Sequence, residues 1–294
     1  MSGQKVLVLC ATGKVGKSVC LALHEAGFVV YGTSRSGIVP GYNGVKCNYA
    51  DKKSLDNALK ETGIKLVFGI TDTFQSAGGS KAKEIQQGKD IIDTCIDNKV
   101  EHFVFCSVGE LEHFNEDTHH IKSKLEIEKY LKSVAQLPYS ILHPYSFFEN
   151  FEDKANYNAF KKGHVMGLST ATMRWCGTYD IGRAAAVMFI NKNAWLSKSL
   201  TVYSWEGSIN DFATAVENVT GVKTTAGLAL PNFIRWFFLP FLHNMCLYFE
   251  AGYPSATGSI EEFKKVIPTA LSAEDWVRRL GRYDDGSPIP YIIK

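Results

Sequence analysis

Residues 6–16 read VLVLCATGKVG, an apolar run that breaks at a turn of small residues and continues as a helical pattern. The pattern predicts a buried parallel strand, a tight turn and a helix N-terminus, whose unpaired backbone N–H groups can bind the pyrophosphate of a dinucleotide. Such a turn normally has three glycines, but here Cys10 takes the first position, and Gly13 and Gly16 take the other two. We therefore expect a dinucleotide-binding unit, with an ordinary first strand and helix as the alternative.

Composition narrows the class of protein. With 294 residues, 45% of them hydrophobic, the chain is long enough for one domain with a large core and an appended lobe. A formal charge of +2 and the absence of basic runs argue against a nucleic-acid partner. The seven cysteines are scattered, with no C-x-x-C spacing, so we expect neither a disulfide framework nor a metal site, and a reduced, cytoplasmic location.

Membrane segments are not predicted either. The first apolar run is too short for a secretory signal. An aromatic-rich segment at 233–249 is interrupted by Arg235, Pro240 and His243, which makes a membrane-spanning helix improbable. We expect this segment to be a buried or pocket-lining helix, and the alternative is contact with a membrane interface or a partner protein.

Strand and helix patterns alternate through the first half of the chain. After the first helix, which Gly27 ends, further strands are predicted at 28–33, 45–48, 66–70, 102–106 and 139–142. Helices are predicted from Asp51 to about Thr62, at 81–98 and at 118–135. This alternation predicts an α/β fold with a doubly wound parallel sheet of Rossmann type, and ligands at the carboxyl ends of its strands.

The rhythm changes after Ser146. Short strands are predicted at 163–169 and 174–177, a helix at 180–190, and a strand at 199–204 that returns to the main sheet. Helices follow at 210–219, 232–249 and 273–280. We expect residues 1–155, with 178–204, to form the dinucleotide-binding domain. Residues 156–177 and 205–294 would form a smaller, mostly helical C-terminal substrate lobe.

Several segments together resemble the NmrA-like branch of the atypical short-chain dehydrogenase/reductases. The matching segments are Cys10–Gly16, Arg35, Gln87-Gly88-Lys89, His120 to Tyr130, Pro144 to Phe151, and Tyr179-Asp180-Ile181-Gly182. The resemblance covers roughly the first half of the chain, with one further match beyond it. It implies a Rossmann fold, a preference for NADP over NAD, and either reductase activity or a nucleotide-sensing role without turnover.

The cofactor choice depends on Arg35, which follows the second predicted strand. An NAD enzyme usually presents an acidic residue there to the ribose 2′-hydroxyl. A guanidinium can instead bind a 2′-phosphate through charge-assisted hydrogen bonds, and Ser34 and Ser36 beside it also suit a phosphate. We therefore predict NADP(H), with a solvated loop arginine as the alternative.

Other residues at strand ends complete the predicted cofactor site. Cys10 should crowd the pyrophosphate turn; a space-filling role is favoured over a low-pKa redox thiol. Asn48 is placed near the adenine, and Ser107 near the nicotinamide. Aromatics after Pro144 should form a floor for a flat substrate, or pack in the core. The expected cofactor-binding residues are Cys10, Thr12, Gly13, Lys14, Val15, Gly16, Arg35, Asn48, Thr71, Asp72, Thr73, Phe74, Ser107, Lys124, Tyr145 and Phe148.

The predicted catalytic pair is His120 and Lys124, which share one helical face at a spacing of four residues. The usual reductase of the superfamily has a tyrosine where His120 stands, and the NmrA-like pattern also has histidine. Lys124 would bind the ribose hydroxyls, and His120 would donate a proton, because its ordinary pKa lies near neutrality. In the alternative interpretation, both belong to a solvated charged face. Asp72 as a catalytic acid is less favoured than a loop cap.

These residues predict an oxidoreductase that transfers hydride between NADPH and a carbonyl, quinone or conjugated alkene of a small organic, aromatic substrate. A non-catalytic NADP(H) sensor that binds a protein partner is the first alternative, favoured by the missing tyrosine and by Cys10. An isomerase or cyclase on the same fold is the second, since fold does not determine reaction.

Overall fold

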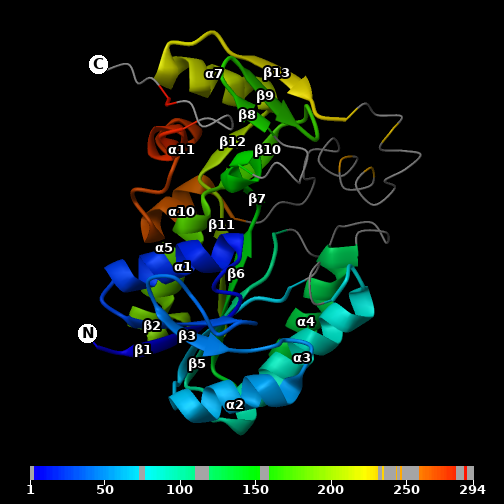
Figure 1. Ribbon diagram of the computed structural model, residues 1–294, viewed down its shortest axis with the longest axis vertical. Helices are drawn as coiled ribbons and strands as arrows, with labels where there is room; N and C mark the ends of the chain where they lie inside the picture. The colour runs from blue at the N-terminus through cyan, green and yellow to red at the C-terminus, as the bar shows by residue number, and fades with distance from the viewer. Residues whose placement is uncertain are drawn as a thin grey trace. The chain divides into compact units, whose positions relative to one another are not determined.

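The computed structural model describes residues 3–72, 77–109, 119–152, 159–230, 234, 243, 246, 258–282 and 288–289 (Figure 1). The chain divides into two compact units. The first contains Met1–Pro144 and Thr178–Val202, and the second contains Tyr145–Gly177 and Tyr203–Lys294. Within the described ranges, no helix has the length and hydropathy needed to cross a membrane.

The first unit is built on a seven-stranded sheet with the order β11-β6-β5-β4-β1-β2-β3, in which every neighbouring pair is parallel. Its strands are β1 Lys5–Val8, β2 Val29–Ser34, β3 Asn43–Lys46, β4 Leu66–Gly69, β5 His102–Cys106, β6 Tyr139–Pro144 and β11 Lys198–Val202. Strand order reverses between β1 and β4, which is where such sheets bind ligands. The sheet confirms the predicted doubly wound fold, and β11 is the predicted strand that returns to it.

Helices cover both faces of this sheet (Figure 1). They are α1 Lys14–Glu25, α2 Lys52–Thr62, α3 Lys81–Asp97, α4 His119–Ser133, α5 Thr178–Ile190 and the short α6 Lys192–Trp195. On one face α1 packs against α5, and on the other α3 packs against both α2 and α4. The core on the second face joins Leu55 of α2, Ile91 of α3 and Ile127 of α4 to apolar strand residues.

Local signals explain where some of these helices begin and end. The Asp51 side chain accepts a hydrogen bond from the Lys53 N–H at 3.0 Å and caps α2, which ends at Gly63 in a left-handed conformation. Gly88 allows α3 and α4 to approach closely, because a Cβ at this position would lie 2.5 Å from the Ile127 side chain. The glycine of the Gln87-Gly88-Lys89 segment is therefore a packing requirement.

The second unit contains two three-stranded sheets, β12-β10-β7 and β13-β9-β8, in addition to its helices. The strands are β7 Ser146–Phe147, β8 Ala159–Lys161, β9 His164–Gly167, β10 Met173–Cys176, β12 Trp205–Gly207 and β13 Thr225–Leu228. Helices described in full in this unit are the 3-10 turn η1 Phe148–Glu152, α7 Ile209–Thr220, α10 Ile260–Val266 and α11 Ala273–Leu280. The lobe expected to be mostly helical thus has a substantial β component. The sequence did not predict all of its strands, because they are too short to show a clear alternating pattern.

Aromatic side chains dominate the core of the second unit. Phe151 stacks on Phe212 with ring centroids 4.1 Å apart, and Phe148 stacks on Trp175 at 6.0 Å. This packing draws residues 145–152 into the second unit, although we expected the first domain to continue to residue 155.

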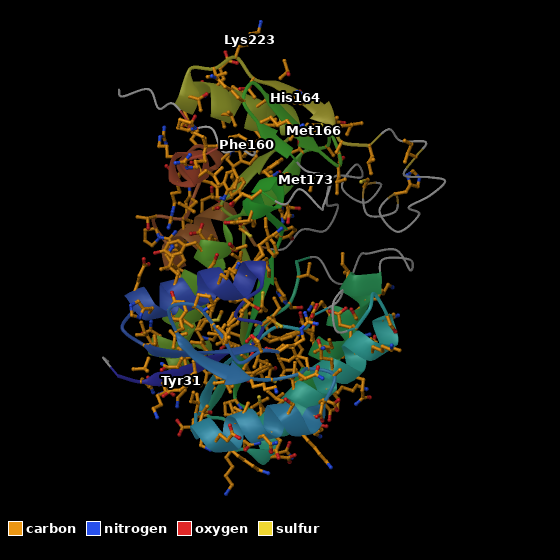
Figure 2. All side chains as sticks on the ribbon, in the orientation of Figure 1. Tyr31, Phe160, His164, Met166, Met173 and Lys223 are labelled. Atoms are coloured by element: carbon orange, nitrogen blue, oxygen red, sulfur yellow. The ribbon has the colours of Figure 1, made fainter. Side chains whose placement is uncertain are left out.

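The β8–β9 hairpin places Phe160 in the aromatic core of the second unit, while His164 and Met166 lie on its other, half-buried face (Figure 2). The helix expected at 232–249 lies outside the described residues, apart from residues 234, 243 and 246.

Candidate functional site

The turn after β1 has an unusual backbone at Cys10. This residue adopts φ 52°, in the left-handed region that glycine occupies without cost. The turn closes when the Gly13 N–H donates to the Cys10 carbonyl at 2.9 Å, and the Ala11 N–H donates to the Thr33 carbonyl at 3.1 Å. Glycine is therefore usual at the first fingerprint position because the turn requires this left-handed conformation, and Cys10 is strained in its place.

Gly16 makes the approach of the helix to the turn possible. A Cβ on Gly16 would lie 2.1 Å from the Cys10 carbonyl oxygen, so a side chain cannot be accommodated. Gly13 forms the N-cap of α1 and, having no side chain, provides no capping hydrogen bond. The first turn of α1 therefore presents amide groups without a side-chain acceptor from the cap, which is the arrangement that binds a pyrophosphate. Val15 is buried, and Thr12 is exposed beside this turn.

Tyr49 is part of the site, although the sequence analysis did not single it out. Its hydroxyl accepts a hydrogen bond from the Cys10 N–H and also bonds the Thr33 hydroxyl. Burial raises the pKa of Tyr49 well above its ordinary value, so the phenol stays neutral. No spacing motif marks it: the only signal is an aromatic hydroxyl two residues after Cys47, where β3 has ended.

The Cys10 thiol is a neutral, inward-facing group. Burial raises its pKa to about 12, with a smaller contribution from Asp72, and its Sγ lies 3.7 Å from the Ile70 carbonyl, to which it donates. A thiol of this kind does not form the thiolate that redox chemistry requires. Of the two interpretations weighed for Cys10, the structure favours the space-filling one.

Arg35 follows β2 directly, and its side chain is exposed. The neighbouring serines shape the loop, since the Ser34 hydroxyl donates to the Ile38 carbonyl at 2.9 Å and the Ser36 hydroxyl accepts from the Ile38 N–H at 3.3 Å. The phosphate-binding role expected of these two hydroxyls therefore competes with loop hydrogen bonds. Arg35 provides the cationic group of this loop.

Asn48, two residues after β3, uses its side chain for local hydrogen bonding. Its Oδ1 accepts from the Ala50 N–H at 3.2 Å, and its backbone N–H donates to the Ser54 hydroxyl at 2.9 Å. The side chain is exposed at the edge where an adenine is expected.

The segment after β4 supplies Thr71 and Asp72, whereas Thr73 and Phe74 lie outside the described residues. The Asp72 N–H donates to Gln87 Oε1 of α3 at 2.7 Å, and its carbonyl accepts from the Ala77 N–H at 3.2 Å. Gln87, buried in the Gln87-Gly88-Lys89 segment, therefore holds the backbone of Asp72 beside the predicted cofactor path.

Lys124 is held in a buried network on the inner side of α4. Its Nζ lies 3.0 Å from Glu84 Oε1 and donates to the Thr71 hydroxyl. Glu84 also accepts from Thr71 at 2.7 Å and from Ser123 at 2.6 Å. Burial acts to raise the pKa of Glu84, but the Lys124 ammonium and these hydroxyls outweigh it, so the pKa is lowered. His120 lies four residues earlier, in the first turn of the same helix, and its side chain lies outside the described part of the chain.

Ser107 lies buried at the end of β5, where its N–H donates to the Leu142 carbonyl at 2.9 Å. Its hydroxyl is close to the Glu128 carboxylate, but has no hydrogen bond of good geometry among the described residues. Glu128 accepts instead from His143 at 2.8 Å and from Lys132 at 3.0 Å. His143, on β6, is thus a partner of a buried carboxylate. The orphaned Ser107 hydroxyl is a group that a ligand can satisfy.

Tyr145 and Phe148 belong to the second unit. The Tyr145 hydroxyl accepts from Arg174 Nη1 at 3.1 Å, and Phe148 is fully buried in the aromatic core. Of the two interpretations, a floor for a substrate and packing in the core, core packing accounts for Phe148.

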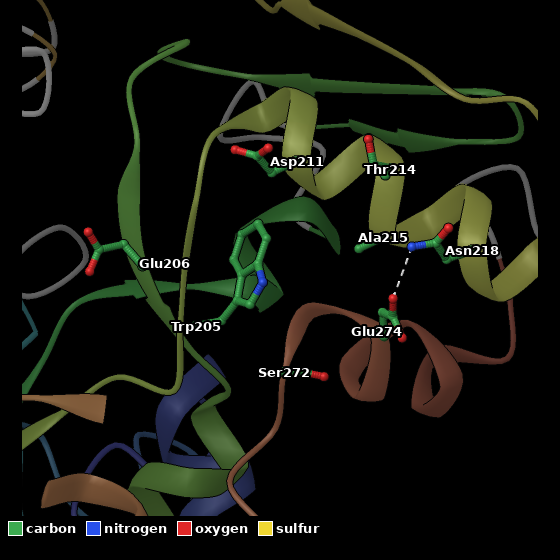
Figure 3. Close-up of a pocket in the computed structure, with 8 residues that line it drawn as sticks. All are labelled: Trp205, Glu206, Asp211, Thr214, Ala215, Asn218, Ser272 and Glu274. Carbon is green, nitrogen blue, oxygen red and sulfur yellow. Dashed lines mark hydrogen bonds between the residues drawn. The ribbon is translucent and has the colours of Figure 1, made fainter. Parts of the chain in front are cut away.

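A separate hollow of 520 Å³ lies on the second unit, between β12, α7 and the start of α11 (Figure 3). Its carboxylates already have partners. Asp211 accepts from the Ser208 N–H at 2.8 Å, Glu274 accepts from Asn218 at 3.1 Å, and Glu206 lies 3.6 Å from Arg174. Three carboxylates in its lining disfavour the phosphates of a dinucleotide. The described residues contain no cluster suited to a metal ion.

The parallel sheet, the small-residue turn and the uncapped helix define a Rossmann protein of the dinucleotide-binding class. The sequence model of the NmrA-like family matches residues 2–234 of the chain. The chain therefore belongs to this family. No curated protein matches the chain in sequence.

Solved structures share this fold over nearly the whole chain. The negative transcriptional regulator NmrA in complex with NADP has a TM-score of 0.74 at 16% identity, covering 95% of this chain and 96% of its own. Triphenylmethane reductase from Citrobacter sp., complexed with NADP(H), has a TM-score of 0.72 at 15% identity, covering 94% and 99%. The NADPH-dependent quinone oxidoreductase from Escherichia coli, complexed with NADPH, has a TM-score of 0.71 at 17% identity, covering 94% and 99%. At these identities the likeness concerns the fold.

Proposed function

We propose that the first unit binds NADP(H), and that the protein is an oxidoreductase for a small carbonyl, quinone or conjugated alkene. One observation carries the binding proposal: the turn after β1 and Lys124 meet at the same edge of the sheet. Cys10 of the turn contacts Ile70, and the adjacent Thr71 bonds Lys124. They meet beside β1 and β4, where the strand order reverses and where dinucleotides bind in sheets of this type.

The residues present fit such a cofactor. The amides of the first turn of α1 would bind the pyrophosphate, Arg35 the 2′-phosphate, and Lys124 the ribose hydroxyls next to the nicotinamide. The buried Ser107 hydroxyl, which lacks a good partner among the described residues, would gain one from the bound ligand. Bound NADPH supplies hydride, and the chain supplies placement, with His120 as the proposed proton donor.

The choice of an oxidoreductase is supported by two of the related folds, which are a quinone oxidoreductase and a dye reductase. A second function remains in competition, namely NADP(H) sensing without turnover. The observation that favours it is the Glu84–Lys124 pair, which neutralises the cation that would otherwise help to ionise a catalytic acid. The NmrA regulator is a related fold that binds NADP.

Two measurements test these proposals. Calorimetric titration with NADPH and NADH should show binding, with NADPH the tighter ligand; absence of binding would refute the cofactor assignment. A screen of quinones, enones and aromatic carbonyls, followed by loss of NADPH absorbance, tests catalysis. Tight NADPH binding with no turnover across the screen would favour the sensor over the reductase.

A further inference from the structure

Glu84 is a fully buried carboxylate whose position is not explained by helix stability alone. It lies in the first turn of α3 and is completely excluded from solvent. An isolated buried carboxylate is costly, and such groups are retained where partners neutralise and hydrogen-bond them. Its partners come from two other segments: Thr71 follows β4, and Ser123 and Lys124 lie on α4.

The hydrogen bonds of this cluster have a consistent direction. Lys124 donates to the Thr71 hydroxyl, and the Thr71 hydroxyl donates to Glu84 Oε1 at 2.7 Å. Lys124 also contacts that same carboxylate oxygen directly at 3.0 Å, while Ser123 donates to the other oxygen, Oε2, at 2.6 Å. The carboxylate therefore accepts from three donors, and the ammonium is held by two acceptors, the Glu84 carboxylate and the Thr71 hydroxyl.

An ammonium has three N–H donors, and two of those on Lys124 are directed at Glu84 and Thr71. The described residues provide no other hydrogen-bond acceptor for it, and the ring of Phe105 lies 5.8 Å from Nζ. One donor is thus left for a ligand at this edge of the sheet.

We propose that Glu84 is the positioning residue of this site: through direct contact and through Thr71, it holds Lys124 as a hydrogen-bond donor for the cofactor ribose. This inference rests on the proposed binding of NADP(H). Lys124 then acts by binding and orienting the ligand, and proton transfer is left to another group.

The pH dependence of NADPH binding distinguishes this role from a structural one. The other titratable groups that interact with Lys124 are the thiols of Cys10 and Cys106, and the carboxylate of Asp72 acts on the Cys10 thiol. Burial raises the pKa of both thiols to about 12, so they remain neutral up to pH 9 or so. A buried ammonium without a carboxylate loses its proton more easily. Removing the Glu84 charge should therefore make NADPH affinity fall as the pH rises.

The test compares NADPH dissociation constants by calorimetry between about pH 6.5 and pH 9. For Glu84→Gln we expect NADPH affinity about tenfold weaker than in the unmodified protein at neutral pH, because a charged hydrogen bond is disturbed. Toward pH 9 the affinity of this variant should fall further, whereas that of the unmodified protein should not. Lys124→Met should weaken binding at every pH, and adding Glu84→Gln to it should cause no further loss, because Glu84 acts through Lys124.

Asp93→Asn is the matched control. Asp93 lies on the same helix as Glu84 and also links α3 to α4, accepting from the Tyr130 hydroxyl at 2.6 Å. The Asp93→Asn substitution should leave NADPH affinity and its dependence on pH unchanged. If Asp93→Asn loses affinity as Glu84→Gln does, helix packing explains the effect and the inference is overturned.

Other outcomes are equally decisive. Equal binding by Glu84→Gln and the unmodified protein at both ends of the pH range overturns the inference alone, as does an additive loss in the double variant. Absence of NADPH binding by the unmodified protein overturns the proposed function as well. If Glu84→Gln does not fold, Glu84→Asp replaces it: we expect weaker binding with a flat pH profile, and unmodified affinity contradicts the proposal.

Discussion

The Tyr49 hydroxyl accepts a hydrogen bond from the Cys10 backbone N–H, and so joins the loop after β3 to the turn after β1. Residues 39 positions apart thereby share one hydrogen bond at the predicted pyrophosphate site. The Thr33 hydroxyl completes the cluster, at 3.2 Å from the same N–H. The tyrosine is therefore a structural support of the turn rather than a member of the glycine fingerprint.

Tyr49→Phe removes this support while keeping the ring. We expect the free energy of unfolding to fall by about 1 kcal/mol, the usual contribution of one hydrogen bond, and NADPH affinity to weaken with it. Denaturant titration and calorimetry measure the two effects. Tyr139→Phe, at the amino end of β6, is the control and should leave affinity unchanged. Unaltered stability and affinity in Tyr49→Phe would show that Thr33 alone satisfies the Cys10 N–H.

Cys10→Gly should stabilise the protein, because glycine adopts the left-handed conformation seen at Cys10 without strain. The expected gain is about 1 kcal/mol, with NADPH affinity held or raised as the backbone is freed to approach the pyrophosphate. Cys10→Ala is the matched control, since it removes the thiol but keeps the Cβ and its strain. A marked loss of NADPH binding in Cys10→Gly would mean that the side chain itself is required.

Arg35→Ala should erase most of the preference for NADPH over NADH. The exposed guanidinium follows β2, and no acidic residue occupies that turn. The loss should correspond to roughly 1.5 to 3 kcal/mol of NADPH binding, with NADH binding unaffected. Lys60→Ala, which removes an exposed cation from α2, is the control. Equal titration curves for the two cofactors in the unmodified protein would contradict the assigned role of Arg35.

His102 makes stability depend on pH. The ring is fully buried, bonds the Ser140 hydroxyl at 2.8 Å, and has a pKa lowered from 6.5 to about 4, mainly by burial and secondly by Lys192. The unfolded chain takes up a proton below its ordinary pKa, whereas the folded protein does not, so stability is lost as the pH falls from 6.5 toward 4.

Denaturant titrations of the unmodified protein should therefore show a loss of about 2 kcal/mol from His102 between pH 7 and pH 5. In His102→Gln the dependence on pH should be smaller by this amount, whatever the absolute stability of the variant. Parallel curves for the two proteins would exclude His102 as the source.

His120→Ala tests the proposed proton donor. The substitution should leave NADPH affinity intact and reduce turnover, with a substrate found by screening, by a factor of roughly 10² to 10⁴. Lys124→Ala, in contrast, should weaken NADPH binding and also lower turnover. Full turnover in His120→Ala would assign the proton to solvent or to the substrate.

The local sequence alone determined the alternation of strands and helices, the turn at Cys10–Gly16 and the helix that begins after Asp51. These features depend on residues close together in the chain: a buried parallel strand needs a short apolar run, and a tight turn needs small residues. The short strands of the second unit escaped prediction in part, because segments of two to four residues carry too little periodicity.

Only the tertiary structure decided which side chains meet. Glu84 and Lys124 are 40 residues apart on α3 and α4, and Tyr49, after β3, bonds to Cys10, after β1. Their contacts depend on the order of the strands, the crossovers that place helices on one face, and the close approach that Gly88 permits. No local pattern encodes these, because the free energy of a buried charge or hydroxyl is set by partners that only folding brings within reach.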